Sequence, residues 1–158
     1  MKQFSFARRA TLLLSVALLT ACASGVKLDD VDGKGSTDYS SQPWNDPKSP
    51  LFKRSVYFDF DSYTVKAEYQ ATLQAHANYL KSNKDRKIKI EGNTDERGTT
   101  EYNLALGQRR SEAVRKSLSL LGVSDSQIEA VSFGKEKPKA QGSNEAAWQE
   151  NRRADIAY

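Results

Sequence analysis

The sequence has a single cysteine, Cys22, and a single histidine, His76. A lone cysteine has no disulfide partner within the chain, and structural zinc sites take their ligands chiefly from cysteine and histidine. We therefore expect no metal site, and no Ser-His or Cys-His pair arranged for nucleophilic catalysis. His76 falls within the apolar stripe of an expected helix, so we expect it to be semi-buried and hydrogen-bonded.

The chain also lacks a large excess of one charge outside its first residues. The formal net charge is +4 over 158 residues, but Lys2, Arg8 and Arg9 lie within the first 21 residues, where there is no acid. The remainder has 21 basic side chains against 20 acidic ones. A nearly neutral chain has no overall field to attract a polyanion, and no basic patch with interleaved aromatic residues is present. These features exclude nucleic acid as an expected partner.

The apolar run near the start of the chain is too short to span a bilayer. Residues 10–21 form a 12-residue stretch without charge, whereas a spanning helix needs about 20 apolar residues. A basic start, a short apolar run and small residues before a break are typical of a secretory signal. The break, Leu19-Thr20-Ala21-Cys22, resembles the lipobox of bacterial lipoproteins.

That resemblance implies a lipoprotein signal peptide over residues 1–21, cleavage before Cys22, and an S-diacylglycerol and an N-acyl chain on that cysteine. A plain signal peptide with an incidental cysteine is the alternative. Lipidation is favoured because a free exported thiol is exposed to oxidation. Ala23, rather than Asp, follows the cysteine, which resembles the lipoproteins sent to the outer membrane.

Composition divides the rest of the chain into a linker and a domain. Residues 22–50 contain the lipidated cysteine and a stretch rich in Gly, Ser, Asp and Lys, with three of the four prolines towards its end. The stretch has no apolar periodicity, so we expect a flexible linker with a typical span of about 30 Å. Trp44 either packs on the domain or docks a partner. We expect the domain to occupy residues 51–158.

Apolar periodicity in the domain alternates between strand and helix patterns. Alternation predicts strands near residues 56–60, 87–92, 127–133 and 154–158. Helical spacing predicts helices near residues 65–80, 101–120 and 144–150, the second capped by Thr99 or Thr100 and closed by Gly122. Helices between strands indicate an α/β (α+β) sandwich, with a small mixed sheet of about four strands and helices packed on one face.

The second expected helix has a core-facing stripe that becomes polar in its N-terminal half. Val114 and Leu118 continue backwards to Gly107 and Asn103, with Arg110 at the edge. This half either overhangs solvent or lines a pocket, because buried polar groups must be paired. The loop over residues 92–98 joins a strand end to this helix, where α/β folds often place ligands.

Asp95 in that loop and Arg110 on the helix are expected to oppose each other across a small cleft. On pattern alone, a structural salt bridge between them is the favoured interpretation. Gly92 and Gly98 are expected to serve tight turns. The basic residues between Lys84 and Lys89 are expected to be solvated, and surface ion pairs are expected for Arg152 and Arg153.

The segment EGNTDERGTTEYNLALGQRRSEAV, residues 91–114, resembles the signature of the OmpA-like, peptidoglycan-binding domain family. The signature residues fall on Thr94, Asp95, Gly98, Asn103, Leu106 and Arg110. The segments VYFDFDSY and NRRADIAY are similar to those of its lipid-anchored members. One departure is Asn93, where such members commonly carry a histidine. An amide does not titrate near neutral pH, so a role that depends on a histidine at this position does not carry over to this chain.

The resemblance implies binding of the peptide stem of peptidoglycan through diaminopimelate, whose free end carries an ammonium and a carboxylate. Asp95 would accept from the ammonium, and Arg110 would hold the carboxylate. The resemblance places further contacts at Phe60, Asp61 and Arg97. It also places Asn103 and Leu106 in the pocket wall.

The resemblance further implies a non-catalytic protein of the outer membrane that faces the periplasm and tethers the membrane to the cell wall. It implies membership of the Tol–Pal envelope system, with a TolB-like periplasmic protein as a competing partner. Two alternatives remain open. One is a lipid-anchored interaction module without wall binding. The other is a wall hydrolase that uses paired carboxylates among Asp59, Asp61, Asp95 and Glu96.

Overall fold

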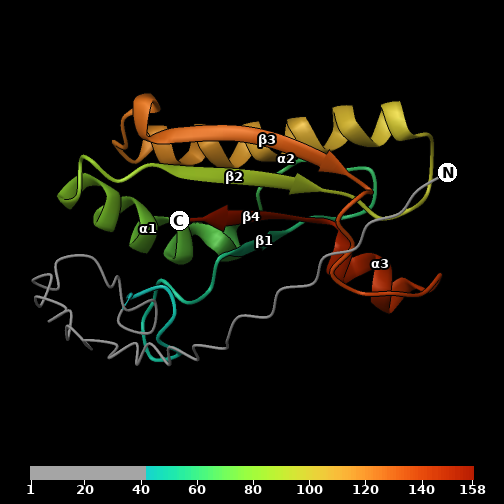
Figure 1. Ribbon diagram of the computed structural model, residues 1–158, viewed down its shortest axis with the longest axis horizontal. Helices are drawn as coiled ribbons and strands as arrows, with labels where there is room; N and C mark the ends of the chain where they lie inside the picture. Colours follow the sequence, from blue (N-terminus) through green and yellow to red (C-terminus); the bar gives the residue numbers. More distant parts are fainter. Residues whose placement is uncertain (1–41) are drawn as a thin grey trace, which may run out of the picture. The chain divides into compact units, whose positions relative to one another are not determined.

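The computed structural model describes residues 42–158 (Figure 1). The expected signal peptide, Cys22 and most of the expected linker lie outside these residues. Within them, no helix is both long enough and apolar enough to cross a membrane. The strands are β1 (Ser55–Tyr57), β2 (Ile88–Asn93), β3 (Ile128–Gly134) and β4 (Arg153–Ala157). The helices are α1 (Gln70–Ser82), α2 (Thr100–Leu120) and α3 (Glu145–Asn151), with 3₁₀ turns η2 (Ala67–Tyr69) and η3 (Asp125–Gln127).

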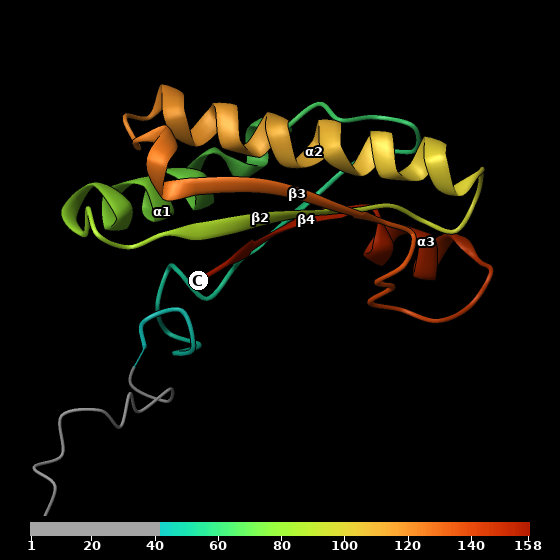
Figure 2. The same cartoon turned by 45° about the horizontal axis from the view of Figure 1, so that its top comes forward.

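The four strands form one mixed sheet in the order β1-β4-β2-β3. β2 and β3 are parallel, with Ile88 opposite Ile128, and α2 makes the crossover that parallel neighbours require. β4 is antiparallel to both β1 and β2. In Figure 2, α1 and α2 cover one face of the sheet, and α3 lies near the end where β2 finishes. The predicted α+β sandwich of four strands is confirmed.

The hydrophobic core fills the space between the sheet and the two longer helices. The sheet contributes Ile90 and Ile156, α1 contributes Leu80, and α2 contributes Val114 and Leu118, all of them buried. The alternation of the strands and the 3.6-residue period of the helices direct these side chains to one layer.

Two glycines set how closely α2 approaches the sheet. Gly92 lies within β2, and a Cβ atom built there would lie only 1.8 Å from the backbone oxygen of Gly107 on α2. The expectation that Gly92 serves a turn is therefore wrong, since its role is to admit the helix backbone. Gly98 does occupy a turn, with φ +94°. The close approach of Gly92 and Gly107 fixes the N-terminal half of α2 against the end of β2.

The ends of α2 follow the sequence signals. Thr99 is the N-cap, and its side chain accepts a hydrogen bond from the Tyr102 amide at 3.2 Å. Gly122 follows the C-terminus with φ +91°, the left-handed conformation that favours glycine.

The first predicted strand and helix differ most from the structure. β1 ends at Tyr57, the Phe58 amide donates to the Arg152 carbonyl at 2.8 Å, and the chain then turns. Phe60 is consequently 62% exposed rather than part of the buried alternation. The first helix begins only at Ala67, with a 3₁₀ turn, and ends at Ser82.

Trp44 packs on the domain. Its ring stacks on Tyr158 with centroids 4.2 Å apart, and the Arg86 guanidinium lies 5.1 Å above its centroid. His76 is hydrogen-bonded as expected, with Nε2 at 2.9 Å from the Lys53 carbonyl and Nδ1 at 2.6 Å from the Tyr158 hydroxyl, but it is fully buried rather than semi-buried. These contacts join residues 42–53, α1 and the end of β4.

Candidate functional site

A cavity of about 240 Å³ lies between the turn after β1, the β2–α2 loop and the first turns of α2. It is lined by Phe60, Asp61, Thr94, Asp95, Arg97, Gly98, Tyr102, Asn103, Leu106 and Arg110. All seven residues proposed from the sequence as pocket residues are therefore together in one cavity. The polar half of α2 lines a pocket and does not overhang solvent.

The β2–α2 loop is held by hydrogen bonds at both of its ends. The Thr94 amide donates to the Gly134 carbonyl at 2.8 Å, which ties the loop to the end of β3. The Asn103 side-chain amide donates to the Arg97 carbonyl at 2.9 Å, which ties the loop to α2. The backbone of the loop is thus held by hydrogen bonds within the protein.

Arg110 is the most buried charged side chain of the cavity, with 0% exposure. Its Nε and Nη1 donate at 2.8 Å to the carbonyls of Ser62 and Asn93, and its Nη2 donates at 3.1 Å to the Asp59 carbonyl. No carboxylate among residues 42–158 lies within 4.0 Å of this guanidinium. Burial lowers the pKa of Arg110 to about 10, so the group remains a cation at neutral pH.

The backbone bonds of Arg110 use three of the five N–H groups that a guanidinium carries. The negative charges of Asp95 and Asp61 offset only part of the cost of burying this cation. An anion in direct contact with it would offset more. The arrangement therefore suits a carboxylate, which a guanidinium grips through two parallel hydrogen bonds.

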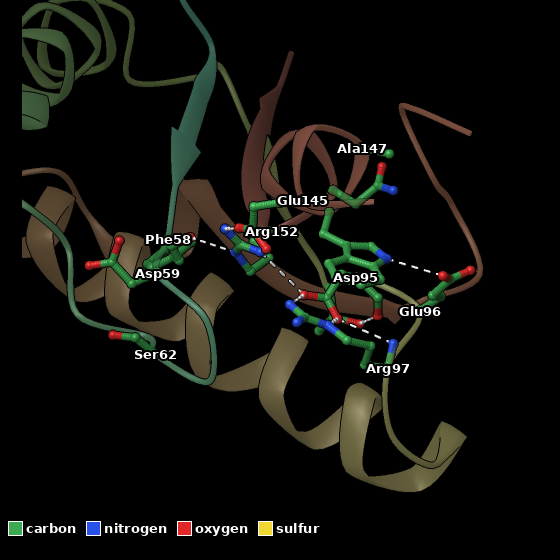
Figure 3. Close-up of polar contacts among 12 residues, drawn as sticks. Phe58, Asp59, Ser62, Asp95, Glu96, Arg97, Glu145, Ala147 and Arg152 are labelled. Carbon is green, nitrogen blue, oxygen red and sulfur yellow. Dashed lines mark hydrogen bonds and ion pairs between the residues drawn. The ribbon is translucent and has the colours of Figure 1, made fainter. Parts of the chain in front are cut away.

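Asp95 is 4% exposed and lies between two other arginines (Figure 3). Arg97 reaches it with Nη2 at 2.6 Å from Oδ2, and Arg152 reaches the same oxygen with Nη1 at 3.5 Å. Burial alone would raise the pKa of Asp95, but the hydrogen bonds from Arg97 outweigh it and hold this pKa below its ordinary value. The carboxylate is therefore ionised at neutral pH.

Within residues 42–158, Asp95 and Arg110 do not form the expected salt bridge. Both line the cavity, but Asp95 pairs with other arginines, and Arg110 bonds only to backbone carbonyls. Asp95 pairs with Arg97, two residues further along, and with Arg152, which lies between α3 and β4 near the far end of the sequence. The sequence spacing gave no sign of that long-range partner.

Arg152 and Arg153 are buried, so the expectation of surface ion pairs is wrong. They are 5% and 7% exposed. Arg152 donates through Nε to the Phe58 carbonyl at 3.2 Å and through Nη2 to Glu145 at 2.6 Å, in addition to its contact with Asp95. Arg153 pairs with Asp155 at 2.8 Å. Arg152 thus does not line the cavity itself but contacts Asp95, which does.

Arg97 covers the solvent side of Asp95 and is itself held between two aromatic rings. Its Cζ lies 4.1 Å from the ring centroid of Phe60 and 4.0 Å from that of Trp148. The Trp148 indole in turn donates to Glu96 at 3.0 Å. Trp148 gave no signal in the sequence beyond its place in a short helix.

The remaining predicted residues complete the wall. Asp61 has φ +54° and accepts a hydrogen bond from the Tyr102 hydroxyl at the rim. Leu106 supplies buried apolar surface. Asn93 does not line the cavity; its carbonyl holds Arg110, while its side-chain oxygen is buried without a hydrogen-bond partner. Across residues 42–158, no cluster of three or more His, Cys, Asp or Glu side chains suits a metal.

Comparison with known proteins identifies the family of the chain. The model of the OmpA family matches residues 57–152. The chain is 47% identical over 144 residues to a peptidoglycan-associated lipoprotein of Pasteurella multocida, covering 91% of this chain and 92% of that protein. It is 38% identical over 169 residues to the protein of that name from Pseudomonas aeruginosa, covering 99% of each.

Solved structures show the same fold. The crystal structure of the peptidoglycan-associated lipoprotein from Burkholderia pseudomallei superposes with a TM-score of 0.72 at 70% identity, covering 74% of this chain and 99% of that one. The C-terminal domain of Helicobacter pylori MotB shares the fold with a TM-score of 0.60 at 22% identity, covering 65% and 81% of the two chains. The chain belongs to the OmpA family and, within it, to the peptidoglycan-associated lipoproteins.

Proposed function

We propose that the protein is a lipoprotein of the outer membrane whose domain binds peptidoglycan without forming a covalent bond. The observation that carries the proposal is Arg110, a fully buried cation with no carboxylate partner among the described residues, in the wall of a cavity that also contains Asp95. The printed names of its relatives, which describe proteins associated with peptidoglycan, support the same conclusion.

The ligand group that fits is the free end of diaminopimelate in the peptide stem. This end carries an ammonium and a carboxylate on one carbon, and the cavity presents an ionised carboxylate and a guanidinium. Arg110 would take the ligand carboxylate through its two unused N–H groups. Asp95 would accept from the ammonium, while Phe60 and Leu106 would contact the aliphatic chain.

The remaining pocket residues have supporting roles in this proposal. Asp61 and Arg97 would contact the ligand at the rim of the cavity. Asn103 would fix the loop through its bond to the Arg97 carbonyl, at 2.9 Å.

The tether belongs to the same proposal. Residues 1–21 would be removed as a signal peptide, and Cys22 would carry the lipid. Of the linker expected over residues 22–50, the part before residue 42 would act as a flexible arm, because Trp44 already packs on the domain. Triacylation provides an anchor far stronger than a single acyl chain. A domain held near the wall lattice meets many stems at high local concentration, so individually weak contacts suffice for retention.

Membership of the Tol–Pal envelope system is the finer part of the proposal. A TolB-like periplasmic protein would bind a surface that overlaps the cavity, so that the wall and this partner would exclude each other. A test is competition between purified TolB-like protein and sacculi for the domain. Simultaneous binding of both would contradict the overlap.

Co-sedimentation with purified sacculi tests the binding proposal. Wild-type protein should pellet with sacculi and be released by a soluble stem peptide that contains diaminopimelate. Asp95→Ala and Arg110→Ala should both lose pelleting while they retain a cooperative unfolding transition. Arg109→Ala is the matched control, because Arg109 lies on the same helix outside the cavity. Wild-type pelleting by both cavity variants would refute the site.

The same sacculi distinguish the two alternatives. A wall hydrolase would release soluble muropeptides, whereas the family to which the chain belongs is non-enzymatic. An interaction module without wall binding would remain in the supernatant under every condition.

A further inference from the structure

The carboxylate of Asp95 is already fully engaged in this structure. Its Oδ1 accepts from the backbone amide and from Nε of Arg97, both at 3.2 Å, and its Oδ2 accepts from Nη2 of Arg97 at 2.6 Å. Arg152, which does not line the cavity, contacts Oδ2 at 3.5 Å. The Asp95 side chain is 5% exposed, whereas that of Arg97 is 33% exposed. Arg97 therefore lies on the side of Asp95 from which a ligand would come.

The geometry holds Arg97 in this position without burying it. The guanidinium carbon lies over the rings of Phe60 and Trp148, at 4.1 and 4.0 Å from their centroids, and Trp148 donates a hydrogen bond to Glu96. Phe60 is itself 62% exposed. Such stacking at exposed sites is weak, so Arg97 is ordered but displaceable. Arg152, by contrast, is buried and also donates to the Phe58 carbonyl and to Glu145, so moving it away from Asp95 would break these bonds as well.

We propose that Arg97 is an internal counter-ion that occupies the ammonium position in the free protein and that a ligand must displace from Asp95. This inference rests on the proposed function and corrects one part of it. Arg97 then acts against the ligand ammonium as a competitor and not as a contact that attracts it. Arg110 has no such internal competitor among the described carboxylates, so the ligand carboxylate can bind there first.

The arrangement selects for a ligand that carries both charges. A free amine would have to displace Arg97 without any gain at Arg110. A ligand anchored through its carboxylate presents its ammonium to Asp95 at high effective concentration, which favours the exchange. The displaced guanidinium would leave the rings of Phe60 and Trp148 and turn towards solvent. Arg97 is thus a specificity-determining residue that suppresses binding of simple cations.

The test compares two stem tripeptides by isothermal titration calorimetry with the full chain. One contains meso-diaminopimelate, and the other contains 2-aminopimelate, which keeps the stem linkage but lacks the free ammonium. Arg97→Gln should tighten binding of the first peptide by about fivefold, because competing charged hydrogen bonds are removed at a partly exposed site. Binding of the second peptide should change by less than about twofold, because no exchange at Asp95 is needed.

Arg109→Gln is the matched control for the loss of one positive charge. Its guanidinium stacks on Tyr63 at 5.6 Å and lies outside the cavity. It should leave the ratio between the two peptides at the wild-type value. Weaker binding of the diaminopimelate peptide by Arg97→Gln, no change, or an equal change for both peptides would each overturn the internal counter-ion. Failure of the wild-type protein to bind either peptide would instead overturn the proposed function.

Tryptophan fluorescence provides a second measurement, which should not change on ligand binding if the role of Arg97 is purely structural. The chain has two tryptophans, and Trp44 packs against Tyr158 and Arg86 away from the cavity. In a Trp44→Phe background, the diaminopimelate peptide should change the emission of Trp148 as the guanidinium leaves its ring. The change should be absent in Arg97→Gln, which still binds. An identical change with and without Arg97 would contradict the displacement.

Discussion

Replacing Arg110 with lysine separates the charge of the cavity cation from its shape. Lysine keeps the positive charge but has three donors on one nitrogen instead of a planar fork. In the protein, Arg110 donates to three carbonyls, those of Asp59, Ser62 and Asn93, at 2.8 to 3.1 Å. An ammonium in the same place cannot reach three separate carbonyls and still present two parallel donors to a ligand carboxylate.

The magnitude follows from the bonds that are lost. A hydrogen bond to a charged group contributes about 1.5–3 kcal/mol, so losing one of the two to the ligand weakens binding by about 10- to 100-fold. The unfolding free energy should fall by about 1–3 kcal/mol, because at least one buried carbonyl loses its donor.

Calorimetry with the diaminopimelate tripeptide gives the first quantity, and urea unfolding gives the second. Wild-type affinity in Arg110→Lys would show that charge alone suffices and would refute the assignment of a forked carboxylate receptor. Weak binding together with a lost unfolding transition would be uninformative about the fork, so Arg110→Lys is paired with Arg110→Gln, which removes the charge as well. The reasoning requires Arg110→Gln to bind no better than Arg110→Lys.

Three further predictions concern stability and location. Burial holds the pKa of His76 below its ordinary 6.5, so at low pH the unfolded chain binds a proton that the folded protein excludes. The unfolding free energy should therefore fall as the pH drops below about 6.5 in urea unfolding, and His76→Gln should flatten this dependence. Gly92→Ala should cost more than about 3 kcal/mol in urea unfolding, because the new Cβ would lie 1.8 Å from the Gly107 oxygen. Gly122→Ala meets only Lys81, at 3.4 Å, and should cost about 1–2 kcal/mol for its left-handed backbone; equal losses in the two glycine variants would contradict the close approach. Cys22→Ser should move the protein from membrane to soluble fractions on cell fractionation, and membrane retention would argue against lipidation.

The periodic signals in the sequence predicted most of the fold. Ile88 and Ile90 on one strand and Val114 and Leu118 on one helix sufficed to place the layers, because strand and helix periods each direct side chains to a single face. The first strand was predicted too long because alternation continues to Phe60. The chain turns after Phe58, where the Arg152 carbonyl takes its amide, and a contact across almost one hundred residues leaves no local trace.

For the candidate site too, the sequence predicted which residues come together but not how they pair. The seven proposed pocket residues do line one cavity, since a motif spans the loop and helix that form it. The predicted partner of Asp95 was wrong because Arg152 reaches it from the junction of α3 and β4, and Arg97 reaches it from the same loop. The role of Gly92 was predicted wrongly because position 92 requires glycine to make room for the opposing helix, and not for its own backbone angles.

A crystal structure of the protein with the diaminopimelate tripeptide tests the central claim most directly. The account predicts the ligand carboxylate within hydrogen-bond distance of the Arg110 guanidinium, its ammonium on Asp95, and Arg97 turned away from that carboxylate. A peptide bound elsewhere on the domain, with the Arg110 cavity empty, would contradict it.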